Sequence, residues 1–295
     1  MPVSALILAS ALWASTMIAN KSIAGDLFIS EITLGRFTIG ALTMYSIALL
    51  AGQGRNLRAI GWGPILLGIL DPGIAAVFMV WGLKLSSAVS GTVLLSTQPI
   101  LMPLLGWLVL RESVRGSVVA GAVVAFLGAL LLIHGQEDHG GGTLLGDVFL
   151  TIGVLVICGA QLIARRIAQI HGRAMAVTSI QLTMAALVGL VVMVFIERPA
   201  APFTNMSSEV VLTILFLGVI GSTGPFFLYN YALRYLTVAM VSLLLTLIAP
   251  LGALMSWLYL GTEVTLLDWI AIGVVVTGVL LPTIYGSRVF RWRRT

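Results

Sequence analysis

The chain has 295 residues, of which 59% are hydrophobic and only 9% are charged. A soluble domain carries about 25% charged residues, so this composition excludes a protein whose whole surface faces water and indicates an integral membrane protein. The formal net charge is +5, and the single cysteine, Cys158, excludes an intramolecular disulfide.

Apolar segments follow one another along the whole chain. Because a helix needs about 20 apolar residues to cross a bilayer, we expect ten transmembrane helices, at residues 2–20, 32–52, 60–83, 88–110, 115–134, 145–164, 174–196, 210–233, 238–260 and 266–287. No basic residue precedes the first segment, which favours a retained helix over a cleaved signal peptide. The predicted fold class is an all-α membrane protein.

Two stretches about 150 residues apart in the chain resemble each other. Residues 82–112 and 232–263 both begin with a small residue, leucine and a basic residue, and both carry one matched proline and end in glutamate. Weaker matches link RFTIGAL at 36–42 with QLTMAAL at 181–187, and GILD at 68–71 with GVIG at 218–221. Several matches in one order indicate an internal duplication.

A polar stretch at 134–143, HGQEDHGGGT, follows the fifth predicted helix and is typical of a linker. We therefore divide the chain into two five-helix repeats, residues 1–138 and 139–295. Five is an odd number, so the second repeat must enter the membrane in the opposite sense. Inverted repeats of this kind are common among secondary transporters.

The basic residues predict the orientation, because lysine and arginine gather on the cytoplasmic side. The side opposite the N-terminus receives only Lys21, Arg36, Lys84 and Arg198. The N-terminal side receives Arg55, Arg58, Arg111, Arg115, Arg165, Arg166, Arg173, Arg234, Arg288, Arg291, Arg293 and Arg294. Both termini are therefore expected to be cytoplasmic. The basic C-terminal tail is expected to anchor the chain at the lipid surface, and no nucleic-acid partner is predicted.

Prolines and glycines within the spans predict bends and close helix packing. Pro99 and Pro250 occupy matched positions in the two repeats, and each removes a backbone donor. A static kink and a hinge beside a cavity both remain open for these two residues. Gly121, Gly128, Gly273 and Gly278 are expected to let helices approach closely.

Polar residues within the spans are few, and Asp71 is the only carboxylate near mid-span. An ionised aspartate there costs roughly 2.5–3.5 kcal/mol. Asp71 could be protonated, paired with Arg36, or exposed to a water-filled cavity. A proton-coupling site and a structural hydrogen bond therefore remain alternatives.

Glu112 and Glu263 follow the fourth helix of each repeat, where they are expected to cap the next helix. No P-loop is present, and His134, His139 and His171 lie in predicted loops or at span ends. We therefore expect no enzyme activity, no metal site and no cofactor.

The chain resembles the EamA-type transporters of the drug/metabolite transporter superfamily. The resemblance covers nearly the whole chain and rests on ALWAST and NK within 11–21, RF at 36–37, GLKLSSA at 82–88, ALRYLTV at 232–238, QP at 98–99, AP at 249–250 and the two glutamates. Within that family it is most similar to the aromatic amino acid exporters of the YddG type. Cys158 and Gln181 depart from strict symmetry, because tryptophan and arginine stand at the matched positions of the first repeat.

The resemblance implies ten helices around a central cavity and transport by alternating access. The candidate cavity residues are Trp13, Phe78, Gln98, Gln161, Tyr229 and Thr246. The implied function is export of hydrophobic amino acids such as phenylalanine, tryptophan or methionine across a bacterial inner membrane. Export of another metabolite or drug is the alternative, and a channel or a membrane enzyme fits less well. Direction of flux, proton coupling and oligomeric state stay open.

Overall fold

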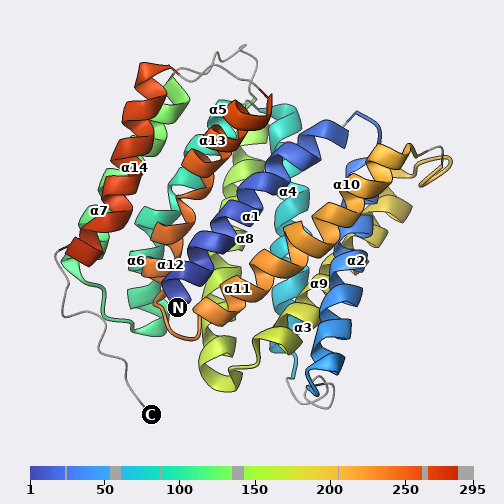
Figure 1. The fold of residues 1–295 in the computed structure, drawn as a ribbon, viewed down its shortest axis with the longest axis horizontal. Coiled ribbons are helices and arrows are strands. Elements are labelled where there is room, and N and C mark those ends of the chain that lie inside the picture. Colours follow the sequence, from blue (N-terminus) through green and yellow to red (C-terminus); the bar gives the residue numbers. More distant parts are fainter. Residues whose placement is uncertain are drawn as a thin grey trace.

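A computed structural model describes residues 1–23, 25–53, 61–86, 88–134, 143–204, 206–260 and 265–284. All regular structure within these ranges is helical (Figure 1). The first half contains α1 (Pro2–Ile23), α2 (Ile29–Leu50), α3 (Gly63–Gly68), the π-helical η2 (Ile69–Ile74), α4 (Ala75–Leu85), α5 (Ala88–Ser96), α6 (Gln98–Leu110) and α7 (Gly116–His134).

The second half begins after the predicted linker, whose residues 135–142 lie outside the described ranges. It contains α8 (Leu144–His171), α9 (Ala174–Val192), η3 (Met193–Glu197), α10 (Ser208–Gly218), η4 (Val219–Thr223), α11 (Gly224–Ala232), α12 (Val238–Leu245), α13 (Ile248–Leu260) and α14 (Leu266–Ile284). Helix α8 extends seven residues beyond the predicted end of its span at residue 164.

Seven described segments are long and apolar enough to cross a membrane: Pro2–Asn20, Ile29–Leu50, Gly63–Leu85, Leu144–His171, Ala174–Glu197, Ser208–Ala232 and Val238–Tyr259. Three further apolar helices are shorter: Gln98–Leu110, Gly116–Leu132 and Leu266–Pro282. Large apolar side chains such as Leu42, Leu104 and Leu212 are more than half exposed. Such exposure is unfavourable in water but suits a lipid surface, and the chain is a multi-pass membrane protein.

Helices of the first half pack mainly on helices of the second half. Helix α2 pairs with α9, and α7 pairs with α14. Figure 1 shows these two pairs at opposite ends of the molecule, with the remaining helices between them. Between the pairs, α1 packs against α11 and α13, while α8 packs against α4 and α6.

Four of the ten predicted spans are interrupted part-way. Short π-helical turns separate α3 from α4 and α10 from α11, and Asp71 within η2 has extended backbone angles (φ −137°, ψ 120°). Thr97 separates α5 from α6, and Thr246 follows the end of α12. Pro99 and Pro250 therefore stand in the first turn of a new helix, where no backbone donor is lost from the hydrogen-bond ladder.

Glycine allows the close contact between α7 and α14. A Cβ atom at Gly121 would lie 2.4 Å from the Gly278 carbonyl oxygen, and one at Gly278 would lie 2.6 Å from the Ala125 amide nitrogen. Gly128 likewise faces the backbone of Val275. Gly273 is different, because a Cβ atom there would meet nothing within 4 Å. The packing prediction is therefore wrong for Gly273.

These two glycines of α14 give a matched pair of variants. Gly278→Ala is expected to push α14 away from α7 and to lower the free energy of unfolding by about 1–3 kcal/mol, the usual cost of overpacking. Gly273→Ala should leave stability unchanged or raise it by up to about 1 kcal/mol, because alanine favours helix. Unfolding of both variants in detergent measures the difference, and equal effects would contradict this account of the contact.

Candidate functional site

A chain of buried amide groups joins three helical segments in the middle of the molecule. The Gln181 side-chain nitrogen donates to the main-chain carbonyl of Asp71 at 2.9 Å. The Asn230 side-chain nitrogen donates to Gln181 Oε1 and to Thr178 Oγ1, both at 2.9 Å. Gln181 therefore satisfies the carbonyl that the break in η2 releases from the helical ladder, as a buried polar group requires.

Arg36 in the first half of the chain makes the contact that corresponds to the hydrogen bond between Gln181 and Asp71. The sequence match pairs Arg36 with Gln181, and the Arg36 Nε donates to Ser222 Oγ in η4 at 3.1 Å. Its guanidinium also lies 4.8 Å from the centre of the Phe37 ring. Among the described residues no ion pair joins Arg36 to Asp71. The pairing that the sequence left open for Asp71 is therefore wrong in this conformation.

A cluster of aromatic side chains on α1 and α11 contains two of the predicted cavity residues, Trp13 and Tyr229. The Trp13 ring meets Phe226 edge-on at 5.3 Å and Tyr229 at 5.8 Å between centroids. Phe226 in turn meets Phe37 at 6.2 Å. Tyr229 is only 3% exposed, and its hydroxyl has no hydrogen-bond partner among the described residues. A buried hydroxyl is normally bonded, so Tyr229 is a candidate binding group.

The two glutamines that were predicted to line the cavity form a hydrogen bond with each other. The Gln161 side-chain nitrogen on α8 donates to Gln98 Oε1 on α6 at 3.3 Å. Gln161 is 4% exposed, and its own Oε1 has no partner in the described part of the chain. Cys158, one turn earlier on α8, belongs to the same buried hydrophobic cluster as Tyr229. The glutamine pair and the aromatic cluster therefore belong to one buried region between α1, α6, α8 and α11.

The other predicted cavity residues lie apart from this region. Phe78 packs on Phe149 of α8, with ring centroids 5.8 Å apart. Thr246 donates its hydroxyl to the Leu243 carbonyl of its own helix at 2.7 Å. Three hollows are described on the molecule, and none of them is lined by a predicted cavity residue. The expected central cavity is therefore not among them.

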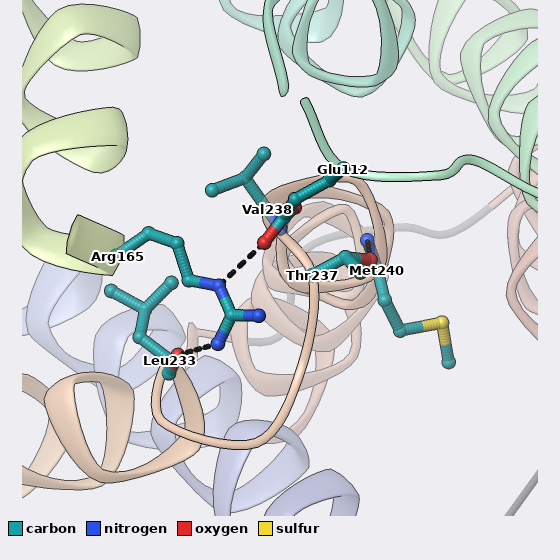
Figure 2. A network of polar contacts seen from close by, with 6 residues as sticks. All are labelled: Glu112, Arg165, Leu233, Thr237, Val238 and Met240. Carbon is teal, nitrogen blue, oxygen red and sulfur yellow. Dashed lines mark hydrogen bonds and ion pairs between the residues drawn. The ribbon is translucent and has the colours of Figure 1, made fainter. Parts of the chain in front are cut away.

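A second polar network lies at the end of α6 (Figure 2). Arg111 adopts left-handed backbone angles, and the Glu112 amide bonds to the Gly106 carbonyl at 3.1 Å, which closes the helix. The Glu112 Oε1 then accepts from Arg165 Nε of α8 at 2.6 Å. Arg165 also donates to the main-chain carbonyl of Leu233, at the end of α11.

The second carboxylate oxygen of Glu112 caps a helix. Its Oε2 accepts from the Val238 amide, at the first residue of α12, at 3.0 Å. Thr237 completes this cap through its hydroxyl, which accepts from the Met240 amide at 3.3 Å. Glu112 was expected to cap the next helix in the chain, α7, and that expectation is wrong. The partner is α12, because inter-half packing brings its N-terminus next to the end of α6.

Sequence reasoning gave Arg165 only a role in orientation. Its side chain is 11% exposed, whereas the adjacent Arg166 is exposed. Two neighbouring residues of a helix point in different directions, so two adjacent arginines do not share one exposed face. The arginine pair was the available sequence signal that one of the two side chains is buried. The matched Glu263 lies outside the described residues.

The described helices offer no metal site. No three histidine, cysteine, aspartate or glutamate side chains of the described residues come together in a way that could hold an ion. The His139 and Glu137 side chains of the predicted linker lie outside the described ranges. The polar groups present are amides, hydroxyls and single charges, which suit recognition of a solute.

The fold defines a polytopic helical membrane protein with a few buried polar groups in its interior. The model of the EamA-like transporter family matches residues 1–134 and 144–284. The chain belongs to this family, within the drug/metabolite transporter superfamily, and is a transporter. The family points to transport and away from enzyme catalysis.

Relatives in bacteria and archaea carry transporter names. An uncharacterized transporter, YyaM of Bacillus subtilis, is 26% identical over 229 residues, covering 76% of this chain and 74% of its own. The uncharacterized transporter YdfC of the same organism is 26% identical over 72% of this chain and 68% of its own. A crystal structure with 20% identity superposes with a TM-score of 0.85 over 98% of both chains, which supports the fold.

Proposed function

We propose that the protein is a secondary transporter that exports aromatic or other hydrophobic amino acids from the cytoplasm by alternating access. The observation that carries this proposal is the buried region around Trp13, Gln161 and Tyr229. Ligand sites are lined mostly by apolar and aromatic side chains with a few placed polar groups. Here Trp13 packs against Phe226 and Tyr229, and the Tyr229 hydroxyl and Gln161 Oε1 lack partners among the described residues.

Alternating access requires two halves that can rock against each other, and we propose two inverted five-helix repeats for this role. In this arrangement α5 and α6 form one crossing, so that the chain crosses the membrane ten times. The helix pairs support it: α2 with α9 and α7 with α14 are each a matched pair. Packing of α1 on α11 and of α8 on α4 is the swap that an inverted repeat requires.

Two hydrogen bonds support the same symmetry at the level of single residues. Arg36 of α2 reaches η4, while the matched Gln181 of α9 reaches η2. The family model also matches the chain in two stretches of similar length. The proposed boundary at residues 138 and 139 falls between those stretches.

We also propose that both termini face the cytoplasm of a bacterial cell, because of the excess of arginine on the N-terminal side. The Glu112–Arg165 network would then lie at the cytoplasmic end of the helices. Phe78, Gln98 and Thr246 stay candidates for the cavity in its open conformation, with the helix interruptions near Pro99 and Pro250 as points of bending.

Counterflow in proteoliposomes tests the proposal. We expect vesicles preloaded with unlabelled phenylalanine to accumulate labelled phenylalanine, tryptophan and methionine, and empty vesicles without protein to show none. A measurement with and without a pH gradient separates proton coupling from facilitated diffusion. Flux of a cationic dye or a nucleobase, with none of any amino acid, would keep the transporter assignment and overturn the proposed substrate.

A further inference from the structure

The polar atoms left without partners in the candidate site are all oxygens. Gln161 uses its side-chain nitrogen on Gln98, so its free atom is the acceptor Oε1. The Tyr229 hydroxyl, which can either accept or donate, is buried and has no partner among the described residues. Gln161 and Tyr229 lie on α8 and α11, which pack against each other. A buried acceptor without a donor costs about 1–3 kcal/mol, so Gln161 Oε1 needs a donor that the described residues do not supply.

The aromatic rings near these oxygens favour a cationic donor as the ligand. Trp13 and Tyr229 lie 5.8 Å apart at 62°, so their faces are not stacked on each other. The face of an aromatic ring attracts a cation within about 6 Å, and tryptophan does so best.

We infer that the group recognised here is a protonated amine, held by Gln161 Oε1 and the Tyr229 hydroxyl beside the rings of Trp13 and Tyr229. This inference rests on the proposed function, since it assigns the chemistry of the same site. It states that the ammonium group of the substrate is required for binding there, whereas a carboxylate alone is not sufficient. A solute that carries only a carboxylate offers no donor to Gln161 Oε1.

Three probes with the same phenyl group separate these possibilities. Phenylalanine carries an ammonium and a carboxylate, 2-phenylethylamine carries only the ammonium, and 3-phenylpropionate carries only the carboxylate. A ligand that binds the folded protein raises its melting temperature with concentration, so titrations of the purified protein give apparent dissociation constants. We expect stabilisation by the two amines and none by 3-phenylpropionate. Equal stabilisation by 3-phenylpropionate, or none by either amine, would overturn the inference.

Two substitutions at Gln161 should affect amine binding differently if the ligand donates a hydrogen bond to this residue. Gln161→Leu removes the acceptor and should weaken binding of 2-phenylethylamine about ten-fold or more, since a hydrogen bond to a charged group is lost. Gln161→Glu keeps an acceptor, adds negative charge, and should bind the amine at least as tightly as the wild type. Unchanged amine binding in Gln161→Leu, or loss of amine binding in Gln161→Glu, would contradict the inference. The same changes at Gln53, which follows α2, are the matched controls.

This experiment and the counterflow assay fail independently. Phenylalanine flux without any preference for the amine over 3-phenylpropionate would leave the proposed function standing and remove the inference. Amine binding that depends on Gln161, without flux of any amino acid, would support the inference and remove amino acids as the transported substrate.

Discussion

Replacing Arg165 by methionine is expected to lower the free energy of unfolding by about 3–5 kcal/mol, the usual cost of breaking a buried ion pair by removing one partner. The variant leaves the Glu112 carboxylate buried next to apolar groups, with only the Val238 amide as a partner. It also leaves the Leu233 carbonyl without its donor. Thermal unfolding of the purified protein in detergent measures the loss.

A matched control lies one residue away. Arg166 is exposed on the same helix, so Arg166→Met should change stability by no more than about 0.5 kcal/mol. The double variant Glu112→Gln with Arg165→Met removes both charges and is expected to recover part of the loss, which a double-mutant cycle reports as a coupling energy. Equal losses in Arg165→Met and Arg166→Met would show that the ion pair contributes little.

The sequence prediction also misjudged the length of α8, because the predicted span stopped at residue 164. In the structure the helix continues to His171 and ends at Gly172, which has left-handed backbone angles. Arg165 lies inside this helix and pairs with Glu112 from the first half. Nothing in the residues around 165 announces that partner. The carboxylate lies 53 positions away in the chain, and only the packing of α6 on α8 brings the two side chains together.

Helix positions could be predicted because apolar run length alone determines them. Side-chain directions could not, because these helices are apolar on every face and give no phase. Gln98 and Gln161 could thus be selected as polar, yet their contact could not be foreseen, and Phe78 was placed with Trp13 although it packs on Phe149. Gly273 and Gly278 are equally indistinguishable by sequence, since only one of them faces a neighbouring backbone.

Asp71→Asn is expected to abolish the response of transport to a pH gradient while the protein stays folded. The structure gives a reason why the variant should stay folded and why its response to pH should be lost. Gln181 bonds to the main-chain carbonyl of Asp71, which asparagine retains. The carboxylate has no donor among the described residues, so its replacement by an amide of the same shape breaks no contact. Only the capacity to gain and lose a proton disappears.

The measurement is labelled amino acid flux in proteoliposomes, with and without an imposed pH gradient, for the wild type and the variant. If Asp71 couples transport to protons, the gradient should stimulate the wild type and leave the variant at its rate without a gradient. Asp268→Asn is the control, because Asp268 lies at the exposed start of α14, where it bonds only to Thr265. A wild-type gradient response in Asp71→Asn would remove Asp71 as the coupling group.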